Sequence, residues 1–81
     1  MALYSIRLNL ELNPGGVYTV TSPDVPGLVT EGRTPEEITR NVQEAIEALL
    51  LGLAEFNLDI PPALRPENAV TPKQLDLLVT V

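Results

Sequence analysis

The side chains that could carry out chemistry in this chain are mainly carboxylates, because the sequence contains no histidine and no cysteine. The commonest general base and the thiolate ligands of zinc are therefore both missing. Serines occur at positions 5 and 22, but a lysine or a carboxylate would have to activate them. A metal site would have to be assembled from acidic residues outside the predicted helix, for which we consider Asp24, Glu31, Asp59 and Asp76. Each of these also fits a turn or a solvated surface, so we predict no catalytic residue, no metal site and no cofactor.

The charge of the chain favours a protein partner over a nucleic acid. Eleven acidic residues against five basic ones give a net charge of −6. Phosphate binding needs clustered lysines and arginines, whereas the basic residues here are dispersed: Arg7, Arg33, Arg40, Arg65 and Lys73. An acidic surface instead suits a basic protein, because opposite charges accelerate encounter. We therefore expect no direct contact with nucleic acid.

The sequence lacks the pattern of a membrane span and of a signal peptide. Its longest uninterrupted apolar run covers residues 48–51, far short of the ~20 residues that cross a bilayer. Residues 1–12 alternate between apolar and polar side chains, whereas a signal peptide has a basic start and an apolar block. We therefore expect a cytoplasmic protein that binds no membrane.

Four strands are predicted from alternating apolar residues and from the turn residues between the runs. Residues 2–12 alternate with period two, which is typical of a strand with one solvated face. Residues 13–16, Asn-Pro-Gly-Gly, reverse the chain into a second strand over residues 17–21. Two further strands are predicted over residues 28–31 and residues 75–81.

The connection between the second and third predicted strands is rich in turn residues. Pro23 and Pro26 cannot donate to a sheet ladder, so they end the pairing there. We expect Asp24 to accept hydrogen bonds from neighbouring backbone N–H groups in an Asx-type turn. Gly27 is suited to a bulge or to a tight return of the chain. All four residues are therefore assigned structural roles.

A long helix is predicted over residues 35–56. Thr34 is expected to be its N-cap, with Pro35 as its first residue and Glu37 as the acidic partner in a capping box. Asn57 is expected to take a left-handed conformation that ends the helix in a Schellman motif. Steps of three and four residues define one buried apolar stripe: Ile38, Val42, Ala45, Ile46, Leu49, Leu53 and Phe56.

The element order is therefore β-β-β-α-β in a single domain over residues 1–81. Residues 59–72 contain four prolines and are predicted to form an extended, semi-rigid connector before the last strand. A right-handed crossover through the helix would place the last strand parallel to the first strand and beside it. The predicted fold class is α+β, with a four-stranded mixed sheet of order 3-2-1-4 and the long helix packed on one face.

The exterior of the predicted helix is the best candidate for a binding surface. On a helical wheel, one apolar residue lies among three glutamates on the side opposite the buried stripe: Glu44, Glu47, Leu51 and Glu55. An apolar centre with a polar rim is the usual anatomy of a protein interface. An ordinary solvated helix face with one exposed leucine explains the same pattern.

Self-association into dimers or tetramers is also expected. Small residues follow one edge of the helix, and among them Gly52 costs about 1 kcal/mol relative to alanine within a helix. Close packing on the sheet of the same chain is the simpler explanation for this glycine, and contact with a second subunit is the alternative. The last predicted strand is apolar on its second face as well. The candidate residues for self-association are Ala48, Gly52 and Leu78.

The segment from residue 15 to residue 50 carries a set of short patterns that resembles the HicB-like antitoxin family. Members combine Gly-Gly and Tyr in a strand, a PD-x-PG turn, T-x-G before the helix, and T-x-EE-A-x-x-N-x-x-EA within it. Ile38 stands where alanine is common and Arg33 where an acidic residue is common, which are minor departures. The connector and the last predicted strand also fit, so the resemblance covers nearly the whole chain. The matching residues are Gly16, Tyr18, Pro23, Asp24, Pro26, Gly27, Thr30, Gly32, Thr34, Glu36, Glu37, Asn41, Glu44 and Ala45.

The resemblance implies a partly degraded ribonuclease-H-like fold and a cytoplasmic prokaryotic protein without enzymatic activity. Such antitoxins bind the HicA toxin, a small basic ribonuclease of double-stranded-RNA-binding-domain type, and cover its active site. The net charge of −6 fits this role, because an acidic protein can compete with RNA for a basic surface. Full antitoxins of the family also carry a C-terminal DNA-binding segment, whereas this sequence stops at Val81. We therefore expect a stand-alone member that does not regulate its operon through DNA.

Three functions are compatible with the sequence. The first is neutralisation of a HicA-type mRNA-cleaving toxin. The second is an orphan oligomeric scaffold or interaction protein of the same family that has no toxin. The third is a residual carboxylate-metal nuclease of ribonuclease-H-like ancestry, which the binding of Mg²⁺ or Mn²⁺ would reveal. A small-molecule sensor is less well supported, since the sequence offers no convergent set of polar residues.

Overall fold

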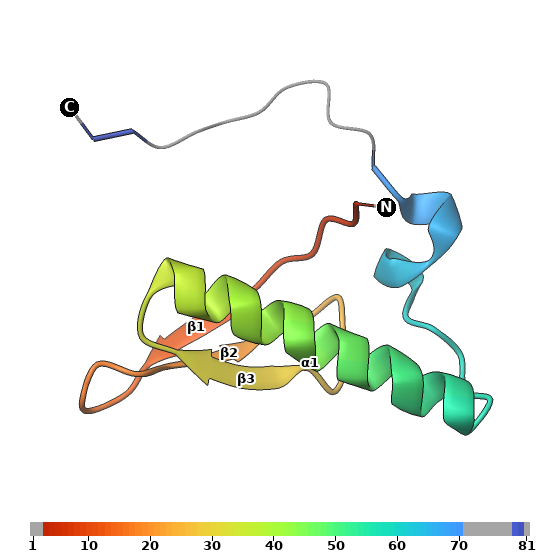
Figure 1. Ribbon diagram of the computed structural model, residues 1–81, viewed down its shortest axis with the longest axis horizontal. Helices are drawn as coiled ribbons and strands as arrows, with labels where there is room; N and C mark the ends of the chain where they lie inside the picture. The colour runs from red at the N-terminus through yellow and green to blue at the C-terminus, as the bar shows by residue number, and fades with distance from the viewer. Residues whose placement is uncertain (1–2, 71–78, 81) are drawn as a thin grey trace.

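The computed structural model describes residues 3–70 and residues 79–80, which form one sheet, one long helix and two short 3₁₀ helices (Figure 1). The strands β1 (Asn9–Leu12), β2 (Tyr18–Thr21) and β3 (Val29–Gly32) pair as antiparallel neighbours in the order β1-β2-β3. The helix α1 (Pro35–Glu55) lies across one face of this sheet. It is followed by η1 (Pro62–Leu64) and η2 (Pro66–Asn68).

The strand register decides which side chains face the helix. Leu10, Val20 and Thr30 lie opposite one another in the three strands, so their side chains share one face of the sheet. Val20 is fully buried in the same cluster as Ile38 and Val42 of α1, which identifies this face as the helix side. The alternate residues of the strands point the other way and are mostly polar. The sheet therefore has the one solvated face that the alternation predicts.

The first strand is shorter than predicted because its neighbour leaves the sheet early. The alternation favours a strand over residues 2–12, whereas β1 contains four residues. Continuing the register of β1 and β2 would place Arg7 opposite Pro23, which has no backbone N–H to donate. The alternation still predicts the correct sides, because Tyr4 and Ile6 are partly buried against the core.

The N-terminus of α1 has the predicted N-cap residue, whereas the reciprocal bond of a capping box, from the Thr34 N–H to the Glu37 carboxylate, is not among the hydrogen bonds of the described residues. Thr34 has an extended backbone, and its Oγ1 accepts a hydrogen bond from the backbone N–H of Glu37 at 3.1 Å. Pro35 is the first helical residue, where its missing N–H removes no helical hydrogen bond. Two glutamates in the first turn, at positions 36 and 37, complement the positive end of the helix dipole.

The C-terminus of α1 is a Schellman motif, as predicted. Asn57 adopts a left-handed conformation with φ of 54°. Its N–H donates to the carbonyl of Ala54 at 3.3 Å, and the N–H of Leu58 donates to the carbonyl of Leu53 at 2.8 Å. The helix ends at Glu55, one residue before the predicted end.

The predicted buried stripe is wrong at its C-terminal end, where Phe56 is 70% exposed. The 21 residues of α1 span about 31 Å, whereas a four-residue strand spans about 13 Å. The last turns of the helix therefore extend beyond the sheet (Figure 1). The buried helix residues are Ile38 and Val42, and the partly buried ones that pack on the core are Ala45, Ile46, Leu49 and Leu50.

The segment after the helix is more structured than the predicted extended connector. It contains both 3₁₀ helices, and Leu64 of η1 is buried in the core together with Val25 and Leu28 of the β2–β3 connection. The backbone N–H of Val70 donates to the carbonyl of Leu3 at 2.7 Å in an isolated antiparallel bridge. The segment therefore returns to the N-terminal part of the chain.

The described residues thus form an α+β fold with a three-stranded antiparallel sheet and one long helix. The fourth strand, predicted over residues 75–81, lies outside the described residues except for Val79 and Thr80, which belong to no strand. The mixed order 3-2-1-4, the ribonuclease-H-like relationship and the single-domain bounds 1–81 therefore stay predictions.

Candidate functional site

The exterior of α1 carries the side chains predicted to bind a partner, and all of them are exposed. We call this set the acidic strip: Glu44, Glu47, Leu51 and Glu55. Its members follow one another at steps of three or four residues, which places them along one side of the helix. Leu51 is 73% exposed, and the side-chain amide of Gln43 donates to the Glu47 carboxylate at 3.0 Å. The geometry provides the surface that the sequence analysis predicted, and its docking role stays a prediction.

Gly52 is not explained by packing within the described part of the chain. A side chain at this position would meet no atom within 4 Å, so the expectation of close packing on the sheet is wrong. Ala48, one turn earlier, is exposed as well. Leu78, the third residue assigned to self-association, lies outside the described residues. Ala48 and Gly52 therefore leave open surface near Leu51, and their role in self-association stays a prediction.

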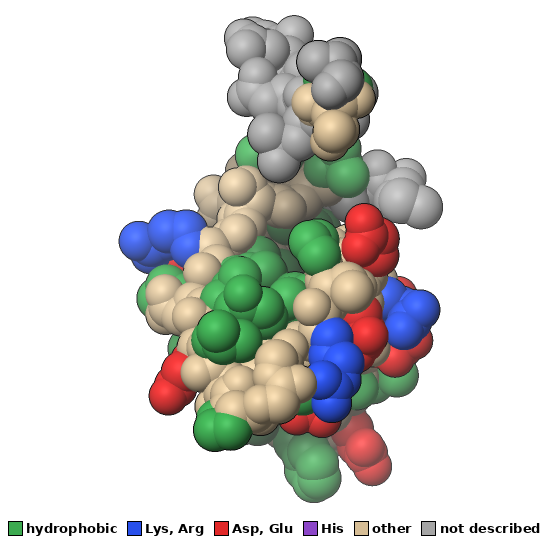
Figure 2. Space-filling view, turned by 90° about the vertical axis from the view of Figure 1, so that its left-hand side faces the viewer, with side chains coloured by type: hydrophobic (Ala, Val, Ile, Leu, Met, Phe, Trp, Pro, Cys, Tyr) green, Lys and Arg blue, Asp and Glu red, His purple; other side chains and the backbone are tan. Residues whose placement is uncertain are grey.

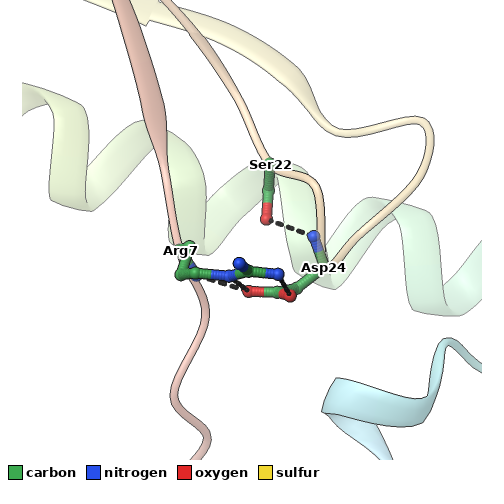
Figure 3. A network of polar contacts seen from close by, with 3 residues as sticks. All are labelled: Arg7, Ser22 and Asp24. Atoms are coloured by element: carbon green, nitrogen blue, oxygen red, sulfur yellow. Dashed lines mark hydrogen bonds and ion pairs between the residues drawn. The ribbon is translucent and has the colours of Figure 1, made fainter.

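An ion pair ties the β2–β3 connection to the segment before β1 (Figure 3). Nη2 of Arg7 donates to Oδ1 of Asp24 at 2.8 Å, and its Nε donates to Oδ2 at 3.2 Å. The backbone N–H of Arg7 also donates to Oδ2 at 2.7 Å. We expected the Asp24 side chain to accept a hydrogen bond from a neighbouring backbone N–H. The local hydrogen bond is formed instead by Ser22, whose Oγ accepts from the backbone N–H of Asp24 at 3.1 Å.

These hydrogen bonds favour the charged form of Asp24. The pKa of the Asp24 carboxyl lies below its usual value of 3.8, first because of the hydrogen bonds from the Arg7 side chain and second because of the bond from the Arg7 backbone N–H. The same side-chain bonds raise the pKa of the Arg7 guanidinium. Because the Arg7 side chain is 77% exposed, water screens the pair, and its main effect is on the position of the connection.

The second half of the connection is a tight turn that directs two residues into the core. The N–H of Leu28 donates to the carbonyl of Val25 at 3.1 Å, with Pro26 and Gly27 between them. Gly27 has φ of 91°, which is the conformation that a type II turn requires after proline. Val25 and Leu28 are both buried. The glycine therefore supplies the tight return expected from the sequence.

Two polar side chains that the sequence analysis gave no role bind backbone carbonyl groups. Nδ2 of Asn41 donates to the carbonyl of Glu31 at 2.7 Å and so holds α1 to β3. Nη1 of Arg33 donates to the carbonyl of Gly15 at 2.6 Å and so supports the turn between β1 and β2. Asn41 matches the family pattern described above, and that match was the available indication in the sequence that this side chain has a role. Arg33 departs from the pattern and gave no signal.

Hydrophobic side chains gather at the centre of one face of the molecule, with charged side chains around them (Figure 2). A groove of about 500 Å³ also lies between the N-terminal segment, α1 and the two 3₁₀ helices. Its walls are mainly apolar and include Leu3, Tyr4, Ile6, Ile46, Leu50 and Leu64.

Within residues 3–70 and 79–80, no group of three or more acidic, histidine or cysteine side chains is placed to hold a metal ion. Asp76, one of the carboxylates considered from the sequence, lies outside these ranges. The helices of the described segments also do not combine the length and apolar character needed to cross a bilayer.

Comparison with known proteins gives a family match and two relatives. Residues 4–78 match the model of a family described as HicB_like antitoxin of bacterial toxin-antitoxin system. The chain is 41% identical to a UPF0150 protein of Thermoplasma acidophilum over 46 residues, which cover 57% of this chain and 67% of that protein. It is 35% identical to an uncharacterized 14.9 kDa protein of the rep-hol intergenic region of Haemophilus phage HP1 over 80 residues. That alignment covers 98% of this chain and 58% of the phage protein, so this chain spans little more than half of its relative.

The family match and the contacts described above concern the same residues. Pro23, Asp24, Pro26 and Gly27 form the connection that is tied to Arg7, and the Thr34 cap opens α1. The match extends from residue 4 to residue 78 and so includes the sheet, the helix and both 3₁₀ helices. The resemblance seen in the sequence is confirmed, and the chain belongs to the HicB-like antitoxin family of bacterial toxin–antitoxin systems.

Proposed function

We propose that this chain is a cytoplasmic antitoxin domain that neutralises a small basic HicA-type ribonuclease toxin by covering its active site. Family membership supports an antitoxin that acts by binding a protein toxin and not by catalysis. The observation that carries the proposal for this chain is the acidic strip on the exterior of α1, where the apolar Leu51 lies among carboxylates.

The acidic strip suits a toxin that binds RNA. A ribonuclease that holds RNA presents basic side chains to the phosphates. The glutamates of the strip can approach those side chains, while Leu51 supplies apolar surface at the centre of the contact. The net charge of −6 adds long-range attraction, which accelerates encounter and weakens as salt increases.

The test is co-expression of this chain with the small basic protein encoded beside it, followed by co-purification and an assay of RNA cleavage. We expect a stable complex that suppresses cleavage and that dissociates with release of activity as the salt concentration rises. A neighbour that forms no complex, or the lack of any such neighbour, would remove the antitoxin role and leave an orphan interaction domain.

The surface is tested separately with charge reversals. The double variant Glu44→Lys and Glu47→Lys is expected to weaken the complex by at least tenfold. Glu67→Lys in η2 is the matched control, because Glu67 is exposed and lies outside the acidic strip. If Glu67→Lys weakens binding as much as Glu44→Lys alone, the attraction is due to net charge and the docking surface is elsewhere.

A leucine substitution separates apolar contact from charge. Leu51→Ala leaves the net charge unchanged and removes the apolar centre of the strip, so we expect faster dissociation with little change in the association rate. Unchanged dissociation would place Leu51 outside the interface even if the glutamates belong to it.

A further inference from the structure

The C-terminal end of α1 carries an exposed aromatic ring beside a glycine. Phe56 follows the last residue of the helix and is 70% exposed. Its N–H donates to the carbonyl of Gly52 at 3.2 Å, so the two residues lie one helical turn apart. A single exposed apolar residue is ordinary on a protein surface. The significance of this ring therefore depends on the groups around it.

Gly52 leaves an open space between the two side chains that follow it on the helix surface. The surface neighbours of a helical residue are three and four positions away, and for this glycine they are Ala48, Leu49, Glu55 and Phe56. Helical side chains lean toward the N-terminus of their helix, so Glu55 and Phe56 lean toward the turn that contains Gly52. A Cβ at Gly52 would nevertheless meet no atom within 4 Å among the described residues. We call this space, between Glu55 and Phe56, the Gly52 notch.

The two walls of the Gly52 notch suit one kind of side chain. Glu55 is exposed and contributes a carboxylate, and the face of the Phe56 ring carries the negative part of its quadrupole. A cation between them is attracted by both groups. An arginine fits better than a lysine, because its planar guanidinium can stack on a ring and donate to a carboxylate at the same time. The lack of a side chain at Gly52 gives such a flat group access to the helix surface.

The Gly52 notch continues the acidic strip, because Glu55 belongs to both and Leu51 directly precedes the glycine. This end of α1 extends beyond the sheet at the lower right of Figure 1, whereas residues 70 and 79–80 lie toward the top of the same view. The last predicted strand would pair with β1, while α1 packs mainly over β3. The notch is therefore defined by side chains of α1 and its cap, whatever lies beside β1.

The arginines of this chain are poor candidates to fill the notch. Three of them bind oxygen atoms elsewhere in the described structure: Arg7, Arg33 and Arg65. Arg40 lies in the same helix, about 18 Å from Gly52 along its axis, and cannot reach it. A second copy could present its Arg40 only against the repulsion between two chains of net charge −6. A basic protein brings both the arginine and the long-range attraction.

We propose that the Gly52 notch receives an arginine of the toxin, whose guanidinium stacks on Phe56 and pairs with Glu55. This inference rests on the proposed antitoxin function and adds a specific requirement to it, since the partner needs an arginine at this point and not only a positive surface. Arginine is also the residue that binds phosphate through paired hydrogen bonds. Its capture in the notch withdraws it from RNA.

Substitutions at Gly52 separate binding from folding. Gly52→Ala should stabilise the free chain, because alanine is the better helix former, and should still weaken the complex, because its methyl group occupies the floor of the notch. Gly52→Gln fills more of the space and should weaken the complex by about tenfold, the upper part of the range for a lost cation–π contact. A complex that Gly52→Gln leaves unchanged would overturn the notch while leaving the antitoxin role intact.

Substitutions at Phe56 test the ring. Phe56→Leu keeps an apolar side chain but removes the ring face, so the complex should weaken by about three- to tenfold. Phe56→Tyr keeps the face and should bind like the wild type. Leu58→Ala is the matched control, because Leu58 is 59% exposed at the same end of the helix but lies outside the notch. Equal weakening by Phe56→Leu and Leu58→Ala would reduce the ring to general apolar surface and overturn the arginine contact.

Peptides test the notch without a toxin. Hexa-arginine and hexa-lysine carry the same charge, so attraction due to net charge is equal for both. We expect hexa-arginine to shift the NMR signals of the Gly52 N–H and the Phe56 ring more strongly than hexa-lysine, and Gly52→Gln to abolish the difference. Equal shifts with both peptides would overturn the preference for arginine, even if a toxin complex forms. Self-association of the chain that Arg40→Ala abolishes would replace the toxin by a second copy as the occupant.

Discussion

The carboxylate of Asp24 accepts three hydrogen bonds from Arg7, which lies 17 positions earlier in the chain. One of them comes from the backbone N–H of Arg7, at the position where the strand register would continue with Pro23. The Asp24 side chain thus takes the place of a strand neighbour at the point where the ladder of β1 and β2 stops. This contact gives the Asp of the PD-x-PG turn a structural role.

The Arg7–Asp24 pair should make part of the stability depend on pH. The folded state lowers the pKa of Asp24 below 3.8, so the contribution is present above that pH and is lost as the pH falls through the lowered value. We expect Asp24→Asn to unfold more easily than the wild type at neutral pH and equally easily below the folded pKa. Urea unfolding across this range measures the difference. A difference that is the same at every pH would show that the charge has no role, and Glu67→Gln serves as the surface control.

Substitution by alanine should have opposite effects on stability at Gly32 of β3 and at Gly52 of α1. A Cβ at Gly32 would lie 2.7 Å from Cγ1 and 3.0 Å from the backbone N of Ile38, so overpacking should cost about 1–3 kcal/mol. Gly52 has open space around it, so Gly52→Ala should gain about 1 kcal/mol from helix propensity. Thermal and urea unfolding of the two variants check both signs. If Gly52→Ala is destabilising, Gly52 packs against something outside the described residues.

The N-cap of α1 should contribute measurably to stability. Thr34→Ala removes the hydroxyl that accepts from the N–H of Glu37, and such losses cost about 1 kcal/mol. Thr34→Ser keeps the acceptor and should stay close to the wild type. Urea unfolding of the two variants measures the effect. Equal destabilisation by alanine and serine would assign the loss to the methyl group and not to the cap.

The contact of Asn41 with β3 should be sensitive to the kind of group at its end. Asn41→Ala removes the donor to the Glu31 carbonyl and should cost about 0.5–1.5 kcal/mol. Asn41→Asp should cost more at neutral pH, because a carboxylate cannot donate and would face a carbonyl oxygen. Urea unfolding at neutral pH gives both values. An aspartate variant as stable as the wild type would mean that the bond is not formed in solution.

Local sequence signals predicted the helix and its ends because each depends on neighbouring residues. Thr34 and Pro35 define the start within two positions, and Asn57 supplies the left-handed residue that the Schellman motif needs. The residues of the acidic strip, which we propose to bind a partner, could be placed on the exposed side of the helix for the same reason. Their exposure follows from helical periodicity.

Long-range geometry could not be predicted in the same way. The sequence does not show that Arg7 reaches Asp24, since the contact depends on where β2 leaves the sheet. It also does not show that the strands are much shorter than α1, and this is why Phe56 was wrongly assigned to the buried stripe. Asn41 illustrates the same limit, because its partner carbonyl lies on the edge of β3.

The amide of Asn41 also protects one edge of the sheet. A sheet with two open edges can add molecules at both ends and grow into a fibre without a fixed size. In this molecule the side chain of Asn41 occupies the outward carbonyl of Glu31, so an incoming strand cannot use that carbonyl of β3. One helix residue therefore acts as a terminator of polymerisation at this edge.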